Sequence, residues 1–105
     1  MNKIGLIGGV TWNSTIDYYR LINQRVNEVC GDYNAAEILI NSVNFNDVYK
    51  FLIEENWHGV EELFTAKALE LKEAGVQFIA ISSNTIAKVA RKVAQNSGLP
   101  LRKRE

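Results

Sequence analysis

The stretch Lys3-Ile4-Gly5-Leu6-Ile7-Gly8-Gly9 decides the fold of this chain. It is a short apolar run that ends at a pair of glycines, which is typical of a strand buried on both faces of a parallel sheet. Two later apolar runs have the same character, and we expect further strands over residues 36–43 and 76–81. The glycine pair predicts a tight turn where the first strand ends.

Segments with helical periodicity separate the expected strands. Ser14-Thr15-Ile16-Asp17 has the spacing of a capping box, and apolar residues then recur every three or four positions, so we expect a helix that stops at Gly31. Three more helices are expected: one over residues 46–53, one capped by Asn56 that stops at Gly75, and one capped within residues 82–85 that stops at Gly98.

This alternation of strands and helices predicts an α/β fold. We expect a flavodoxin-like, three-layer sandwich around a short parallel sheet of three to four strands, in which residues 99–101 open the last strand. The chain has 105 residues, of which 47% are hydrophobic, and this fits one core, so residues 1–101 are expected to form a single domain. The charged run over residues 102–105 is interpreted as a solvated tail in preference to a basic binding patch.

The composition excludes several classes of function. Twelve basic and twelve acidic residues cancel, which removes the broad electrostatic basis for a nucleic-acid or anionic-membrane partner. Cys30 is the only cysteine and His58 the only histidine, so we expect no intramolecular disulfide and no structural zinc site. The N-terminal apolar run is too short and glycine-rich for a signal peptide or a membrane span, and we expect a cytoplasmic protein.

Neither Cys30 nor His58 is expected to belong to a ligand site. Cys30 lies where the first helix should end, which is the side of this fold that faces away from ligands, and we interpret it as a buried or half-buried structural thiol. His58 lies in the first turn of a later helix and is interpreted as a solvated side chain in preference to a base.

Two loops are candidates for a ligand site, because ligands of an open parallel sheet bind outside the carboxyl ends of its strands. The loop over residues 8–14 contains the glycine pair and hydroxyl groups, and Ser82-Ser83-Asn84-Thr85 offers hydroxyls and an amide at the start of a helix. Together they predict a pocket for a small carboxylate or phosphate. Each loop also has a purely structural interpretation, as a tight turn and as a plain helix cap. The glycine fingerprints of dinucleotide-binding and phosphate-binding loops are absent, so nucleotide binding would rest on fold analogy alone.

Four segments carry a resemblance to a known family. The most specific begins Gly5-Leu6-Ile7-Gly8-Gly9-Val10-Thr11-Trp12-Asn13-Ser14-Thr15 and runs to residue 23; the others are residues 36–45, Asn56-Trp57, and residues 74–81 with 84–90. Over about residues 3–100 the sequence resembles the aspartate/glutamate racemase family, the amino-acid racemases that work without pyridoxal phosphate. The resemblance implies an isomerase of amino-acid metabolism with no cofactor and no metal, and a small amino acid or carboxylate as its ligand.

The resemblance also implies a mechanism with two acid/base groups, because inverting an amino acid requires removing the Cα proton from one face and returning a proton to the other. The family takes one such group from each of two similar α/β halves. In the first half this group stands directly before an Asn-Thr pair, and Ser83 occupies that position here. Asn84 and Thr85 would hold the substrate carboxylate, and the rest of the pocket would be lined by Gly8, Gly9, Thr11 and Trp12.

The sequence departs from the family in three ways. Ser83 stands where cysteine, or in some members threonine, is usual, and a serine hydroxyl is a far weaker base than a thiol. Ser82 likewise stands where one subgroup has a second cysteine, and Ala87 where a histidine is common. Members of the family are about twice as long, so the chain resembles only their N-terminal half, and we expect it to be inactive or nearly so by itself.

Two alternatives to an enzyme remain at this point. The chain could be a degenerate, non-catalytic homologue that binds a small ligand or associates with itself, because a truncated sheet leaves an unpaired edge strand and uncovered apolar surface. It could also be a flavodoxin-like nucleotide-binding domain. A homo-oligomer is therefore among the expected partners.

Overall fold

Three parallel strands form the centre of the molecule, whose computed structural model describes residues 3–83 and 86–101. They are β1 (Ile4–Gly8), β2 (Ile38–Ser42) and β3 (Phe78–Ile81), and they lie in the order β2-β1-β3. Ile4 of β1 is in register with Ile38 of β2 and with Phe78 of β3. The glycine-terminated stretch that begins the sequence is therefore the central strand, as its fully apolar character predicts.

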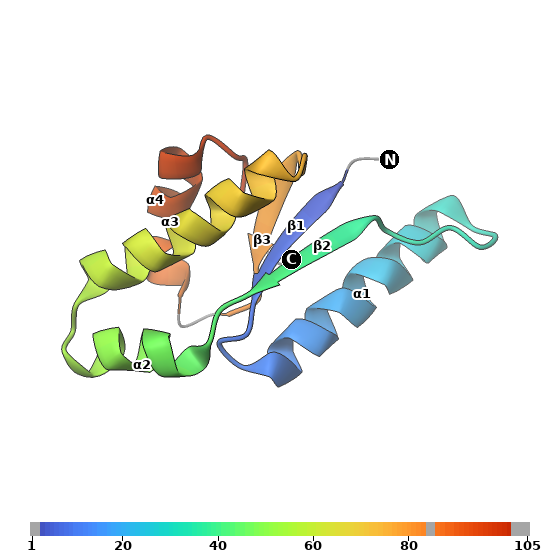
Figure 1. The fold of residues 1–105 in the computed structure, drawn as a ribbon. Helices are drawn as coiled ribbons and strands as arrows, with labels where there is room; N and C mark the ends of the chain where they lie inside the picture. Colours follow the sequence, from blue (N-terminus) through green and yellow to red (C-terminus); the bar gives the residue numbers. More distant parts are fainter. Residues whose placement is uncertain (1–2, 84–85, 102–105) are drawn as a thin grey trace.

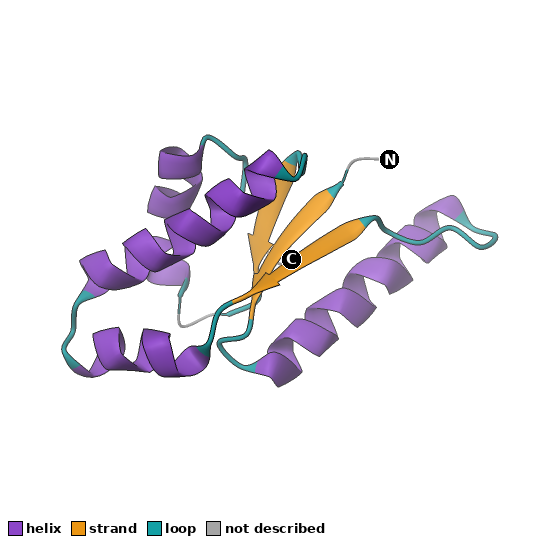
Figure 2. Ribbon diagram, viewed as in Figure 1, coloured by secondary structure: helices purple, strands orange, loops and turns teal. Residues whose placement is uncertain are grey.

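Helices cover both faces of this sheet, as Figures 1 and 2 show. A Cβ atom built on Gly5 would meet Leu71 of α3 (Trp57–Glu73), whereas one built on Gly8 would meet Thr15 of α1 (Trp12–Cys30). Because residues an odd number apart along a strand point to opposite faces, α1 and α3 lie on opposite sides of the sheet. Helix α4 (Ala87–Ser97) packs against α3, and the short α2 (Phe45–Ile53) precedes α3 and packs against it. This confirms the predicted α/β sandwich.

The main hydrophobic core lies on the α3 side of the sheet. Phe64 and Val60 of α3 are fully buried, and they belong to one cluster with Ile7 of β1, Ile79 of β3 and Val93 of α4. Close packing extends to α2, since a Cβ atom on Gly59 would fall within 2.5 Å of the ring of Phe51.

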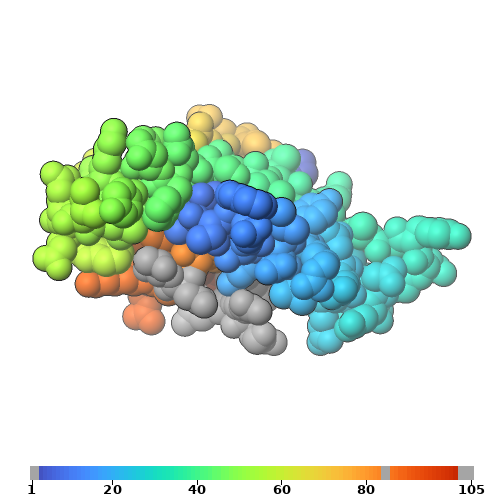
Figure 3. All heavy atoms as spheres, turned by 90° about the horizontal axis from the view of Figure 1, so that it is seen from below, coloured from blue at the N-terminus to red at the C-terminus, as the bar shows by residue number. Residues whose placement is uncertain are grey.

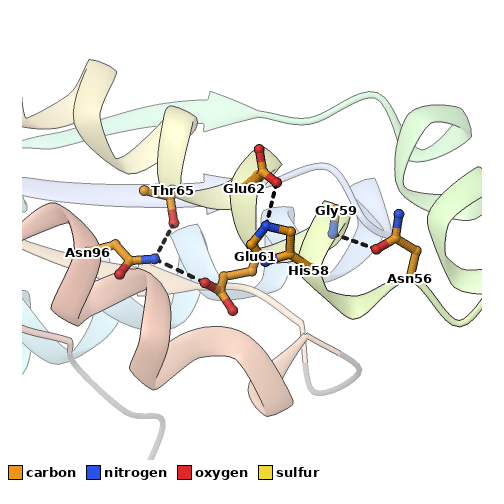
Figure 4. A network of polar contacts seen from close by, with 7 residues as sticks. All are labelled: Asn56, His58, Gly59, Glu61, Glu62, Thr65 and Asn96. Atoms are coloured by element: carbon orange, nitrogen blue, oxygen red, sulfur yellow. Dashed lines mark hydrogen bonds and ion pairs between the residues drawn. The ribbon is translucent and has the colours of Figure 1, made fainter.

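Polar contacts fix the surface of the α3 layer (Figure 4). The Asn56 side chain accepts a hydrogen bond from the backbone N–H of Gly59, which confirms the predicted cap of α3. Asn96 of α4 donates to the carboxylate of Glu61 at 3.2 Å and to Thr65 Oγ1 at 3.5 Å, so α3 and α4 are also joined across their exposed rim.

The strands and most helix ends agree with the sequence-based expectations. Gly98 ends α4 in the left-handed conformation with φ of 76°, and Gly31 follows α1 with a positive φ of 71°. Beyond α4, Ile79 N–H donates to Pro100 O at 2.9 Å and Leu101 makes a parallel bridge to Ile79. Leu101 thus lies beside β3, on the side away from β1, where the last strand was expected to open. The expected tail over residues 102–105 lies outside the described residues.

The predicted start of α1, with Ser14 as its N-cap, is wrong by three residues. The helix begins at Trp12 with Thr11 as its N-cap, and the Thr11 side chain makes no capping hydrogen bond to the backbone. Ser14 accepts a hydrogen bond from Thr11 Oγ1 at 2.7 Å. The capping-box spacing was misleading because Thr15, which lies inside it, faces the strand ends.

The interpretation of Cys30 as a buried or half-buried thiol is also wrong, because Cys30 is exposed. In Figure 1 the last turns of α1 and the loop that follows extend past the end of the sheet, so no strand lies under them. Val29, in the same turn, is 71% exposed. Cys30 does lie on the side of the fold that was expected, at the end of α1 away from the carboxyl ends of the strands. Among the described residues, no helix combines the length and the apolar character needed to cross a membrane.

Two substitutions on α3 test this account of the core. Replacing the fully buried Phe64 with alanine should lower the free energy of unfolding by about 3–5 kcal/mol, because it leaves a cavity between helix and sheet. Leu69→Ala, on the exposed side of the same helix, is the matched control and should change it by less than about 0.5 kcal/mol. Urea denaturation followed by circular dichroism measures both values, and equal losses would contradict the assignment of the core.

Candidate functional site

The carboxyl ends of all three strands meet at one edge of the sheet. Val43 N–H, just after β2, donates to Gly8 O at 2.8 Å, and Ser82 N–H, just after β3, donates to Ile7 O at 3.1 Å. The glycine turn and the Ser82-Ser83 corner are therefore neighbours, as the parallel sheet predicts. Figure 3 views the molecule from below this edge, where the start of α1 and helix α2 lie side by side.

Thr15, in the first turns of α1, joins these strand ends. Its hydroxyl accepts a hydrogen bond from Gly9 N–H at 3.0 Å and shares another with Ser82 Oγ at 3.0 Å. Both side chains are buried, with 8% of Thr15 and 1% of Ser82 exposed. Ser82 Oγ also lies 3.4 Å from Ile7 O, to which it can donate. One hydroxyl thus connects the turn after β1, the start of α1 and the end of β3.

Contacts within the protein explain why both positions of the turn, 8 and 9, are occupied by glycine. A Cβ atom on Gly8 would lie 2.5 Å from Thr15 Oγ1. Gly9 has φ of 94°, which disfavours any other residue, and a Cβ atom there would collide with the carbonyl oxygen of Val43. The Cα faces of both glycines are therefore filled by the chain itself. That Gly8 and Gly9 contact a ligand remains a prediction. Any such contact would have to be made by their backbone N–H and C=O groups.

The remaining predicted site residues divide into three groups. Ser83 directly follows Ser82 and is partly buried at the site edge. Thr11 and Trp12 lie where α1 starts, and 69% of the Trp12 side chain is exposed. Asn84 and Thr85 lie outside the described residues. The N-cap of α4 is Ile86, so Ser82 and Ser83 do not serve as a plain cap of that helix.

His58 and Trp57, in the first turn of α3, have contacts of their own. His58 is 77% exposed, and its Nε2 lies 2.7 Å from a carboxylate oxygen of Glu62 (Figure 4). Trp57 is partly buried against the core. Within residues 3–83 and 86–101 no three His, Cys, Asp or Glu side chains are grouped closely enough to hold a metal ion. Among the described residues of the edge, the polar side chains joined by hydrogen bonds are the hydroxyls of Thr15 and Ser82.

Thr15 is the residue that sequence reasoning missed, because it was assigned only a place within a capping motif. A signal for its role was present in the periodicity. Thr15, Tyr18, Ile22 and Val26 recur at helical spacing on the more buried side of α1, and Thr15 is the one small hydroxyl residue among them. A small hydroxyl on a buried helical stripe, just after a glycine turn, predicts a polar contact with that turn.

Thr15→Val tests this polar connection with little change in side-chain shape. It should lower the free energy of unfolding by about 1–3 kcal/mol, because Gly9 N–H and the buried Ser82 hydroxyl each lose a partner. Thr15→Ser keeps the hydroxyl and is the matched control, with a smaller loss. The amide signal of Gly9 in NMR spectra should move strongly in the valine variant only. A valine variant as stable as the unchanged protein would show that these hydrogen bonds do not contribute to the free energy of unfolding.

Comparisons with known proteins agree with this geometry. A family model described as Asp/Glu/Hydantoin racemase matches residues 7–103. A crystal structure of a putative Asp/Glu racemase from Yersinia pestis is 40% identical, with a TM-score of 0.93 over 96% of this chain and 44% of that chain. A crystal structure of an aspartate racemase homologue from Pyrococcus horikoshii OT3 is 31% identical, with a TM-score of 0.83 over 98% of this chain and 45% of that chain.

The chain thus spans less than half the length of both solved relatives, and the part that it matches is their N-terminal half. The end of the central strand, the glycine turn and the Ser82-Ser83 corner all lie within the residues that the family model covers. The chain belongs to the Asp/Glu/Hydantoin racemase family.

Proposed function

We propose that this chain is the N-terminal half of an amino-acid racemase that acts on aspartate, glutamate or a similar amino acid by proton transfer at Cα, without pyridoxal phosphate. The observation that carries the proposal is the meeting of the glycine turn and the Ser82-Ser83 corner at one edge, joined through Thr15. This edge presents amide groups and hydroxyls to a small acid, and the start of α1 adds the positive end of a helix dipole.

In the proposed mechanism Ser83 stands on one side of the substrate Cα. Its hydroxyl would exchange a proton with one face of that carbon, while Asn84, Thr85 and the backbone amides of the turn orient the carboxylate. A second acid/base group must face the opposite side of Cα, since inversion moves the proton from one face to the other. The longer relatives have more than half of their chain beyond the part matched here, and that remainder is where we place the second group.

Two properties of this half weaken its own reactivity. A serine hydroxyl is a poorer base than a thiolate, and the only histidine of the chain, His58, is engaged with Glu62 on the surface of α3. Because the proposed second acid/base group lies outside this chain, the chain alone should bind its ligand without racemising it. These observations favour, as a second candidate, a non-catalytic homologue that only binds a small ligand at the same edge.

Ligand binding is tested by two-dimensional NMR of the 15N-labelled chain with aspartate or glutamate added. At about 10 mM ligand, binding with even a millimolar dissociation constant is detected. We expect the amide signals of Gly9, Thr11 and Ser83 to shift. Gly31 and Gly75 serve as internal controls, because they lie at the far ends of α1 and α3. The diamide of each amino acid, which lacks both carboxylates, should produce no shift. If neither amino acid moves the site signals, or if the control glycines move equally, the proposed site is wrong.

Catalysis is tested separately by following the Cα hydrogen of aspartate and glutamate in deuterated buffer. With the unchanged chain, the Cα proton signal should decay no faster than in a protein-free sample. Ser83→Cys is the informative variant, because a thiolate can remove and return a proton on one face. It should produce exchange of the Cα hydrogen with retained configuration. Rapid exchange by the unchanged chain would show that the Ser83 hydroxyl is not too weak a base, and inversion of configuration by that chain would refute the one-sided mechanism. Binding without exchange in the cysteine variant would favour the non-catalytic candidate.

A further inference from the structure

Three aromatic side chains are exposed where helices α1 and α2 begin. Trp12 is the first residue of α1 and Phe45 the first residue of α2, and 69% and 40% of these residues are exposed. Tyr49, one turn further along α2, is 50% exposed, and its ring centroid lies 5.9 Å from that of Phe45. We refer to Trp12, Phe45 and Tyr49 as the edge aromatics. Much of their apolar surface is left outside the core of the chain.

The edge aromatics adjoin the proposed ligand site. Helices α1 and α2 begin just after the loops that follow β1 and β2, and the hydrogen bond from Val43 N–H to Gly8 O brings these two loops into contact. In Figure 3 the start of α1 and helix α2 lie side by side at this edge. A ligand whose carboxylate is held at the glycine turn would therefore have the edge aromatics beside its side chain.

The loops and helix starts of this edge contain no basic side chain. Residues 8–17, 42–49 and 82–87 include neither lysine nor arginine, whereas the first two ranges include the acidic residues Asp17 and Asp47. A carboxylate bound by a protein is best stabilised by the charged hydrogen-bond donors of arginine or lysine. Bringing the second carboxylate of aspartate or glutamate against aromatic rings, with no such donor, would remove its water without replacement.

The basic residues that follow these ranges in the sequence are engaged or directed elsewhere. Lys88, in the first turn of α4, has its Nζ 4.6 Å from the ring centroid of Trp57, which is a cation–π contact. Arg20 lies roughly 12 Å along the helix axis from the start of α1, and its guanidinium is 3.7 Å from the carboxylate of Asp17. Lys50 lies in the last turn of α2 and points about 100° around the helix from the aromatic residue before it.

We propose that the amino acid bound at this edge has an uncharged, apolar side chain, of the kind found in methionine, in preference to a second carboxylate. The inference rests on the proposed function, which it narrows to the neutral amino acids. Trp12 and Phe45 are then specificity-determining residues, because they cover the side chain of the ligand while the glycine turn holds its carboxylate. An apolar chain against aromatic rings gains from the burial of both surfaces, and a thioether sulfur packs well against such rings.

Amino acids of similar length test the charge of the side chain directly. The 15N-labelled chain is titrated with methionine, glutamine and glutamate and followed by two-dimensional NMR. Methionine should have a dissociation constant at least about tenfold lower than that of glutamate, with glutamine between them, because only glutamate must bring an unpaired charge to the aromatic rings. Methionine should also shift the indole N–H signal of Trp12 and the amide signal of Phe45, together with those of Gly9 and Ser83.

Two arginine variants on the same helix test the specificity role. Phe45→Arg supplies the cation that the edge lacks, so it should reverse the preference and make glutamate bind more tightly than methionine. Ile53→Arg is the matched control, because it adds the same charge at an exposed apolar position at the other end of α2, and the preference for methionine should remain. Circular dichroism checks that each variant is folded.

The outcomes separate this inference from the proposed function. If glutamate binds the unchanged chain as tightly as methionine does, the inference on the side chain is wrong and the proposed site stands. If none of the three amino acids shifts Gly9 or Ser83, the proposed function fails and this inference fails with it. Methionine that shifts these two signals but not those of Trp12 and Phe45 overturns the role of the edge aromatics.

The additional polypeptide of the longer relatives is the other possible neighbour of the edge aromatics. A separately produced C-terminal half of a relative is therefore added to the labelled chain in a parallel experiment. If the signals of Trp12 and Phe45 move with that polypeptide and not with methionine, these side chains belong to an interface between the two halves, and the proposal is overturned. Equal preferences in the Phe45→Arg and Ile53→Arg variants would overturn it as well.

Discussion

The hydroxyl of Thr15 is the contact on which the arrangement of the site depends. It accepts from Gly9 N–H and shares a hydrogen bond with Ser82 Oγ, while the Thr15 side chain fills the space that a Cβ on Gly8 would need. These hydrogen bonds are directional, unlike the apolar packing of the core. The hydrogen bonds give the turn, the helix start and the Ser82-Ser83 corner fixed relative positions.

Much of the fold could be predicted from the sequence because local and long-range requirements agree. The run from Lys3 to Gly8 is apolar at almost every position, so it could only be a strand covered on both faces, and the helical stripes supply that cover. The start of α1 was misjudged for the opposite reason. There the local capping pattern at Ser14 competed with a tertiary contact of Thr15, and spacing alone does not reveal tertiary contacts.

The site was predicted less completely than the fold. Parallel strands bring their carboxyl ends together whatever the side chains are, so the meeting of Gly8, Val43 and Ser82 followed from topology. The reason for the glycines did not, because Gly9 is required by the carbonyl group of Val43, which is 34 residues away in the sequence. The exposure of Cys30 was missed because helix periodicity does not tell how far a strand extends beneath the helix.

The two ends of α1 differ in how firmly they are held. At its start the helix is bound to the sheet through Thr15, whereas at its end Val29 and Cys30 are exposed and Tyr33, in the loop beyond, has no cover at all. The last turn should therefore fray far more often than the first, since few buried contacts oppose its opening. Insertions, deletions or a fused peptide near Gly31 should therefore be tolerated. Thermal motion of the last turn of α1 should not disturb the geometry of the edge at which Thr15 and Ser82 meet.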